Sequence, residues 1–127
     1  MPKPLKIAVV GCGYWGPNLI RNFRALTDCT LDAICDTEQK RLTHLAGLYP
    51  GVRTFTRFDQ LMADGSFDAL VVATPVRFHY QLAKVALDMG KHAFIEKPMA
   101  ASSAECMDLV KTAASQNLTL MVGHTFL

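Results

Sequence analysis

The 127-residue sequence contains no long hydrophobic run and no cluster of charges of one sign. No apolar stretch approaches the roughly 20 residues that a membrane-spanning helix needs. Thirteen Lys and Arg residues against eleven Asp and Glu give a net charge of +2, and the basic residues are scattered along the chain. A nucleic-acid-binding surface gathers its basic residues in a patch or stripe. We therefore expect neither a membrane nor a nucleic acid as a partner.

The four cysteines, Cys12, Cys29, Cys35 and Cys106, also lack a functional pattern. No two of them are spaced as a CxxC pair, and the four histidines add no zinc-like arrangement. The first residues lead directly into a short apolar run instead of the long apolar segment of a secretion signal. We interpret the cysteines as reduced thiols of a cytoplasmic protein, and we predict no metal site.

What the sequence does contain is an alternation of short apolar runs with amphipathic segments. Strands are expected at residues 5–10, 31–35, 52–55, 69–73, 92–95 and 118–122, and helices at 14–26, 37–48, around 58–62, at 78–89 and at 102–116. The helix at 37–48 is expected to turn Leu42, Leu45 and Leu48 inward, and the helix at 78–89 to have an apolar face formed by Phe78, Leu82, Val85, Ala86 and Met89. Ser102 followed by Glu105 has the pattern of a capping box. The run 69–73 is continuously apolar, which is typical of a strand covered on both faces. Strands that alternate with helices form parallel sheets with right-handed crossovers. The pattern predicts an α/β fold, a doubly wound sheet in the order 3-2-1-4-5-6.

Residues 11–16, Gly-Cys-Gly-Tyr-Trp-Gly, match the pattern G-x-G-x-x-G between the first expected strand and its helix. In that context the pattern indicates a dinucleotide-binding turn. Gly11 permits the tight turn, Gly13 lets a diphosphate approach the backbone, and Gly16 lets the helix pack closely on the strand. The N–H groups at the helix start attract the diphosphate. The alternative is a glycine turn that binds nothing.

Asp36 lies 20 residues after Gly16, at the end of the second expected strand. A carboxylate there can accept hydrogen bonds from the adenosine ribose and repels a 2′-phosphate, which favours NAD over NADP. Asp36 followed by Gln39 also has the pattern of a helix N-cap, and the two roles are compatible. Arg41 is close enough to complicate the cofactor preference, although a surface role without specific function is the simpler interpretation.

Two further segments, Thr74-Pro75 and Glu96-Lys97-Pro98, follow expected strands. Ligands of open α/β sheets bind outside the carboxyl ends of the strands, so both segments are placed to line a cofactor cleft. Lys97 could hold a reacting hydroxyl or help to move its proton, or it is an ordinary surface lysine paired with a carboxylate. His79, at the start of the next helix, either contacts the cofactor or fills a packing site.

The segments GCGYWGPNLIRNF, ICD, ATP with His79, IEKPMA and MVGHTFL together resemble the glucose–fructose oxidoreductase/inositol dehydrogenase (Gfo/Idh/MocA) family. The resemblance covers essentially the whole chain and is nearest to members that act on sugars or nucleotide sugars. It implies that Gly11, Gly13, Tyr14, Trp15 and Gly16 cradle the diphosphate and that Asp36 holds the ribose. It also implies that Thr74, Pro75, His79, Glu96 and Pro98 surround the nicotinamide, with Lys97 near the reacting carbinol.

This resemblance implies an NAD-binding Rossmann domain at residues 1–122, with residues 123–127 beginning the crossover to a substrate domain that the 127 residues do not include. The intact enzyme would be an NAD-dependent dehydrogenase that transfers a hydride between nicotinamide and a secondary hydroxyl of a sugar, polyol or nucleotide sugar. Homo-oligomers are expected only with the second domain. We expect these residues alone to bind cofactor without turnover. The alternative is a stand-alone NAD-binding module with a regulatory or scaffolding role.

Overall fold

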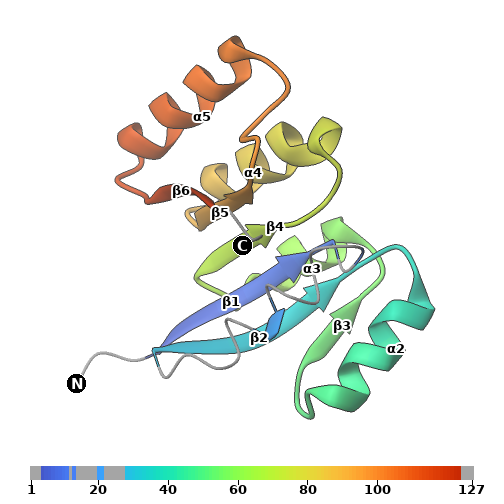
Figure 1. The fold of residues 1–127 in the computed structure, drawn as a ribbon. Helices are drawn as coiled ribbons and strands as arrows, with labels where there is room; N and C mark the ends of the chain where they lie inside the picture. The colour runs from blue at the N-terminus through green and yellow to red at the C-terminus, as the bar shows by residue number, and fades with distance from the viewer. Residues whose placement is uncertain (1–3, 12, 14–19, 22–27, 124–127) are drawn as a thin grey trace.

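The computed structural model describes residues 4–11, 13, 20–21 and 28–123. Its strands are β1 (Leu5–Val10), β2 (Cys29–Cys35), β3 (Arg53–Phe55), β4 (Ala69–Val72), β5 (His92–Glu96) and β6 (Leu120–Gly123) (Figure 1). Its helices are α2 (Gln39–Leu48), α3 (Phe58–Asp64), α4 (His79–Asp88) and α5 (Ser103–Ser115), and a 3-10 turn, η1 (Val76–Phe78), precedes α4. The helix predicted at 14–26 lies largely outside the described residues; Ile20 and Arg21 are helical, and Ile20 is fully buried.

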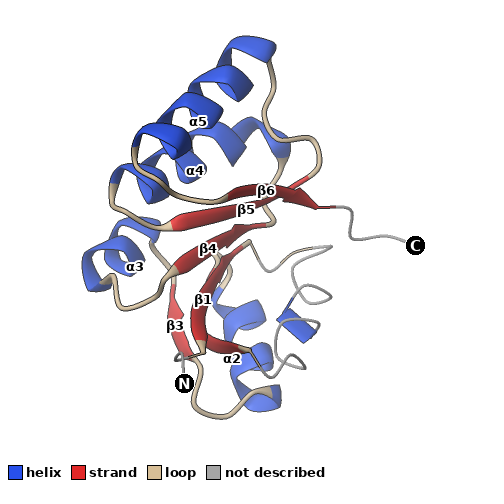
Figure 2. Cartoon of the chain, turned by 90° about the vertical axis from the view of Figure 1, so that its left-hand side faces the viewer, coloured by secondary structure: helices blue, strands red, loops and turns tan. Residues whose placement is uncertain are grey.

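The strands form one parallel sheet in the order β3-β2-β1-β4-β5-β6, which confirms the predicted topology. Helices α3, α4 and α5 lie on one side of this sheet and α2 lies on the other (Figure 2). All four residues of β4 are buried, as its continuous apolar run predicts for a strand covered on both faces. The order of the strands reverses between β1 and β4, and this switch point opens a crevice at their carboxyl ends.

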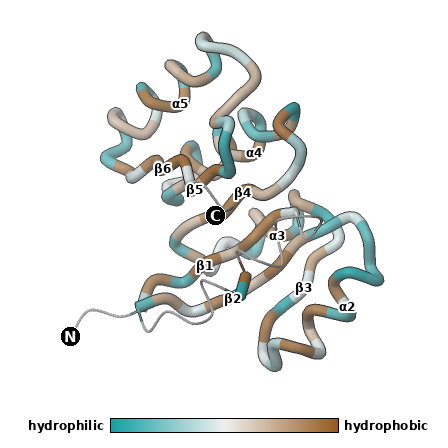
Figure 3. The backbone as a smooth tube through the Cα atoms, in the orientation of Figure 1, coloured by the Kyte–Doolittle hydropathy of each residue, from teal (hydrophilic) through white to brown (hydrophobic). Residues whose placement is uncertain are grey.

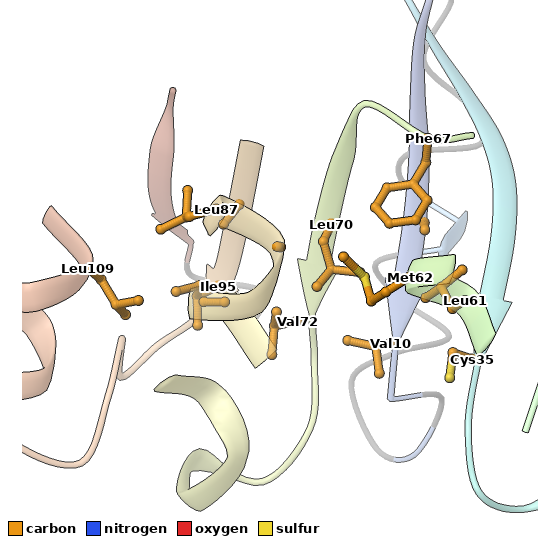
Figure 4. Close-up of a cluster of buried hydrophobic side chains, with 14 of the residues drawn as sticks. Val10, Cys35, Leu61, Met62, Phe67, Leu70, Val72, Leu87, Ile95 and Leu109 are labelled. Atoms are coloured by element: carbon orange, nitrogen blue, oxygen red, sulfur yellow. The ribbon is translucent and has the colours of Figure 1, made fainter. Parts of the chain in front are cut away.

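Buried side chains form a separate core on each face of the sheet. The larger core joins the sheet to α3, α4 and α5, and Figure 4 shows Val72 and Ile95 of the strands beside Leu87 of α4 and Leu109 of α5. The smaller core packs β1 and β2 against α2 and Ile20. In Figure 3 the strands are mainly brown, whereas teal and brown alternate along the helices, because only one side of each helix faces the sheet.

Strand β2 contains an irregularity that explains its imperfect alternation of apolar and polar residues. Ile7 of β1 pairs with Leu31, but the next residue, Ala8, pairs with Ala33, so Asp32 is an extra residue in β2. Leu31 and Ile34 belong to the smaller core, and the residues on either side of Ile34 belong to the larger one. The extra residue therefore shifts the alternation by one position, as a β-bulge does.

The predicted start of α2 and the predicted inward faces of α2 and α4 need correction. Helix α2 begins at Gln39, two residues later than expected, and its Leu48 is 57% exposed although it was predicted to face inward. Helix α4 begins at His79, because residues 76–78 form the 3-10 turn after Pro75. Its buried residues are His79, Ala83, Ala86 and Leu87. The predicted apolar face through Phe78, Leu82, Val85, Ala86 and Met89 is thus wrong except at Ala86 and the partly buried Leu82.

One helix start agrees with its sequence pattern at the N-cap. Ser102 is the N-cap of α5, and its hydroxyl oxygen accepts a hydrogen bond from the Glu105 backbone N–H at 3.2 Å. The Glu105 carboxylate in turn accepts from the Ala101 N–H at 3.2 Å. The Ser102 hydroxyl therefore satisfies one N–H group of the first turn, whereas the Glu105 carboxylate bonds the N–H of the residue before the N-cap and not the N-cap N–H that a capping box uses.

Candidate functional site

A cleft of about 670 Å³ opens at the carboxyl ends of the strands, on both sides of the switch point between β1 and β4. The turn after β1 contributes Gly11 and Gly13, and the end of β2 contributes Cys35 and Asp36. The loop after β4 adds Ala73, Thr74 and Pro75. Five of the predicted cofactor residues therefore line a single cleft, namely Gly11, Gly13, Asp36, Thr74 and Pro75. Tyr14, Trp15 and Gly16 lie outside the described residues.

Gly11 brings the backbone of the first turn against the loop after β4. Its φ is +93°, and a Cβ built on it would lie 2.8 Å from the carbonyl carbon of Ala73 and 2.8 Å from the nitrogen of Thr74. A side chain is therefore excluded both by the backbone angle and by the neighbouring backbone. The Gly11 N–H also donates to the Cys35 carbonyl at 2.8 Å, so the turn is held to β2. The predicted tight turn at Gly11 is confirmed.

Beside Gly13 the structure is more open. Within the part of the chain that the structure describes, a Cβ on this residue would meet the Arg41 guanidinium at 3.5 Å, an ordinary van der Waals distance, and no backbone atom. The cleft therefore reaches the main chain at this point. A negatively charged group could approach the backbone here, next to the positive charge of Arg41.

Asp36 lies at the other end of the cleft and is only 7% exposed. Its Oδ1 accepts a hydrogen bond from the Glu38 N–H at 2.8 Å, and its Oδ2 lies 3.6 Å from Nη1 of Arg41. Glu38, and not Asp36, is the N-cap residue of α2, and its side chain makes no capping bond. The alternative N-cap interpretation of Asp36 is thus wrong, since the carboxylate closes the turn that precedes the helix.

Sequence reasoning missed several residues of the cleft. Thr56 and Phe58, next to β3 and α3, line it together with Phe78 and Leu82 from the other side of the switch point. Arg41 lines it as well, in spite of its expected surface role. The charge of Arg41, five residues after Asp36 and in the first turn of α2, was the only signal in the sequence. The apolar residues carry no such signal, because they look like core positions.

The thiol of Cys35 lies in the floor of the cleft and is 3% exposed. Burial, followed by the charges of Asp36 and Asp59, raises the pKa of Cys35 to about 11. The thiol therefore stays protonated at neutral pH and is a poor nucleophile. Cys35 serves as an apolar surface under the cleft.

The segment Glu96-Lys97-Pro98 lies beside the cleft rather than in its lining. Glu96 ends β5 and is 9% exposed, whereas Lys97 and Pro98 are exposed and joined by a cis peptide bond. The Lys97 N–H donates to the Gly123 carbonyl at 3.1 Å, which ties this loop to β6. Lys97 is exposed, which agrees both with a role at a reacting hydroxyl and with an ordinary surface lysine.

His79 connects the two loops on this side of the cleft. Its ring is 1% exposed; Nδ1 lies 2.7 Å from the carbonyl oxygen of Pro98, and Nε2 lies 2.7 Å from the carbonyl oxygen of Thr74. Both nitrogens are thus occupied by the backbone. Among the described residues, no group of three or more His, Cys, Asp or Glu side chains could hold a metal ion, and no helix is long and apolar enough to cross a membrane.

The topology, the glycine turn and the acidic residue after β2 agree with a comparison to known proteins. Residues 5–124 match the Gfo/Idh/MocA family, described as an oxidoreductase family with an NAD-binding Rossmann fold. The chain belongs to this family. It is 31% identical over 122 residues to D-apiose dehydrogenase of Rhizobium rhizogenes. The aligned region covers 96% of this chain and 35% of that relative.

Solved structures of the family show the same fold. Scyllo-inositol dehydrogenase from Lactobacillus casei, with bound NAD(H) and scyllo-inositol, superposes with a TM-score of 0.87 at 28% identity. The match covers 95% of this chain and 36% of the dehydrogenase chain. The WlbA dehydrogenase from Bordetella pertussis, in complex with NADH and UDP-GlcNAcA, superposes with a TM-score of 0.89 at 31% identity. The match covers 97% of this chain and 36% of the WlbA chain. The chain therefore spans about a third of the length of these relatives.

Proposed function

We propose that this chain binds NAD(H) across the cleft, as the cofactor domain of an oxidoreductase that acts on a secondary hydroxyl of a sugar, polyol or nucleotide sugar. The observation that carries the proposal is the meeting of Gly11, Gly13 and Asp36 in one cleft at the switch point. A turn with glycine at residues 11 and 13 suits a diphosphate, and a nearly buried carboxylate suits a ribose diol. The relatives bound to NAD(H) and NADH support the same cofactor.

The described residues fit the two halves of a dinucleotide. Asp36, at the end of β2, would accept hydrogen bonds from the adenosine ribose, and the turn at Gly11 and Gly13 would hold the diphosphate. Thr74 and Pro75, across the switch point, would then lie on the nicotinamide side, with Glu96 and Pro98 behind them. We propose that Tyr14, Trp15 and Gly16 complete the diphosphate turn.

Bound nicotinamide supplies a carbon that accepts or donates a hydride. We propose that Lys97 holds the reacting hydroxyl and moves its proton. Its loop follows β5 directly and lies next to the proposed nicotinamide side of the cleft. The relatives are about three times longer than this chain. We therefore propose that substrate selection and homo-oligomer contacts belong to a further domain, and that residues 1–127 alone bind the cofactor without turnover. We further propose a cytoplasmic location, where the cysteine thiols would stay reduced.

Calorimetric titration with NAD, NADH, NADPH and ADP-ribose tests the cofactor proposal. We expect NADH to bind more tightly than NADPH, and we expect Asp36→Ala to weaken NADH binding by about tenfold or more, as for a lost hydrogen bond to a charged group. Glu38→Ala is the matched control, because it removes an exposed carboxylate two residues away that caps nothing. Equal losses in both variants would refute the ribose role of Asp36. Steady NADH production from sugars or polyols would refute the proposed lack of turnover.

A further inference from the structure

We propose that His79 is a positioning residue that fixes the nicotinamide side of the cleft by tying the loop after β4 to the loop after β5. This inference rests on the proposed cofactor function. It assigns to His79 an action through two backbone segments, in place of the direct cofactor contact that the sequence suggested.

The geometry of the ring carries the proposal. The two nitrogens of His79 lie on opposite edges of the imidazole, and each is 2.7 Å from a carbonyl oxygen of a different loop, Thr74 on one side and Pro98 on the other. Carbonyl oxygens only accept, so a neutral ring donates its N–H to one of them and a ring with both nitrogens protonated donates to both. With 1% of its surface exposed, the ring has no edge left for a ligand.

The two segments that His79 joins lie beyond the end of the ladder between β4 and β5. Strands β4 and β5 pair only as far as Val72 and Ile95, so the backbone beyond these residues leaves the ladder. Thr74 lines the cleft, and Pro98 follows Lys97 directly. His79 therefore couples the wall of the cleft to the loop that carries Lys97, and it does so from the first residue of α4, which is anchored in the larger core.

This placement predicts a selective defect. A dinucleotide lies across the switch point with its adenosine at β2, so its nicotinamide half faces the loops that His79 joins. Loss of His79 should loosen these loops and leave the Asp36 end of the cleft unchanged. A merely structural role would instead lower the binding of every ligand equally, through the folded fraction.

Titration with NADH and with ADP-ribose, which lacks the nicotinamide, separates the two cases. For the wild-type chain we expect tighter binding of NADH than of ADP-ribose. For His79→Leu we expect about a tenfold loss for NADH, because the two loops are no longer joined through the ring, with ADP-ribose affinity unchanged within about twofold. His92→Leu is the matched control: Nδ1 of His92 accepts a hydrogen bond from the Thr119 N–H at the opposite end of β5, so this variant also loses a histidine bond to the backbone. We expect it to affect both ligands alike.

Two conservative variants keep the proposal testable if His79→Leu does not fold. An Asn side chain places its amide nitrogen near the position of Nδ1 and can keep the bond to Pro98, whereas Gln places it near Nε2 and can keep the bond to Thr74. Both His79→Asn and His79→Gln should weaken NADH binding less than Leu does, with thermal unfolding as the check on folding.

The outcomes distinguish this inference from the cofactor proposal. If wild-type protein binds neither ligand, the proposed function fails and this inference fails with it. If ADP-ribose binds but His79→Leu lowers both affinities by the same factor, only the positioning role of His79 is refuted. The same holds if wild-type protein binds NADH no more tightly than ADP-ribose.

Discussion

The guanidinium of Arg41 lies 3.6 Å from the carboxylate of Asp36, Nη1 to Oδ2, and the same Nη1 is the nearest neighbour of a Cβ placed on Gly13. Arg41 therefore stands between the group proposed to bind the ribose and the turn proposed to bind the diphosphate. The carboxylate is nearly buried, whereas the Arg41 side chain is 52% exposed. The local charge at the ribose end of the cleft depends on this pair.

Removal of Arg41 should sharpen the preference for NADH over NADPH. In Arg41→Ala the Asp36 charge loses its partner and should repel a 2′-phosphate more strongly. Because exposed ion pairs contribute only about 0.2–1 kcal/mol, we expect the ratio of the two affinities to rise by about two- to fivefold. Calorimetric titration at low salt measures it. Lys40→Ala, an exposed cation one residue earlier, should leave the ratio unchanged, and a ratio unaffected by Arg41→Ala would contradict the prediction.

The turn at Gly11 should tolerate no side chain. In Gly11→Ala the positive φ and the contact with the backbone of Ala73 act together, and we expect a loss of about 1–3 kcal/mol in the free energy of unfolding. Gly47, in α2, has nothing within 4 Å of its Cβ position. Gly47→Ala should therefore stabilise the protein by up to about 1 kcal/mol. Urea denaturation of both variants measures the contrast, and equal effects would refute it.

The cap of α5 should contribute measurably to stability. Ser102→Ala removes the acceptor of the Glu105 N–H, and we expect a loss of about 1 kcal/mol. Ser103→Ala is the matched control, because Ser103 is the first residue of the helix, is exposed and is not the N-cap. Thermal unfolding compares the two variants. Ser102→Asp should restore most of the loss, and a failure of Asp to do so would argue against a capping role.

Stability should fall in acid partly through Asp64. Hydrogen bonds from Arg53, first, and from Ser66 lower the pKa of Asp64 from 3.8 to about 2. Because this pKa is lower in the folded state, the contribution of Asp64 is complete above about pH 4 and is lost as the pH falls through about 2. Carboxyl NMR titration should show this midpoint, and Arg53→Met should raise it towards 3.8. Arg57→Met, which removes the partner of Asp59 instead, should leave the Asp64 midpoint unchanged.

The sequence allowed correct prediction of features that depend on local patterns. The strand order follows from the alternation of apolar runs and helices, the Ser102 cap from two residues, and the turn at Gly11 from a short motif. Features that depend on distant contacts were missed. Phe58 and Phe78 line one cleft from segments on opposite sides of the switch point, and their apolar side chains look like core residues in the sequence. The inward face of α4 was mispredicted at Phe78, because residues 76–78 form a 3-10 turn, whose three residues per turn direct side chains differently from an α-helix.

The extra residue at Asp32 determines which side of the sheet the later residues of β2 face. Each residue after it faces the side of the sheet opposite to the one that uninterrupted pairing would give. Deletion of Asp32 would let Ala33 follow Leu31 in regular alternation, so Ile34 would still face the smaller core and Cys35 the larger one. Pairing of Asp32 with Ala8, without the bulge, would instead reverse both side chains and displace Asp36 from the cleft. We therefore expect homologous chains either to keep this bulge or to lack one residue at this place, and to keep the number of residues from Ala33 to the aspartate constant.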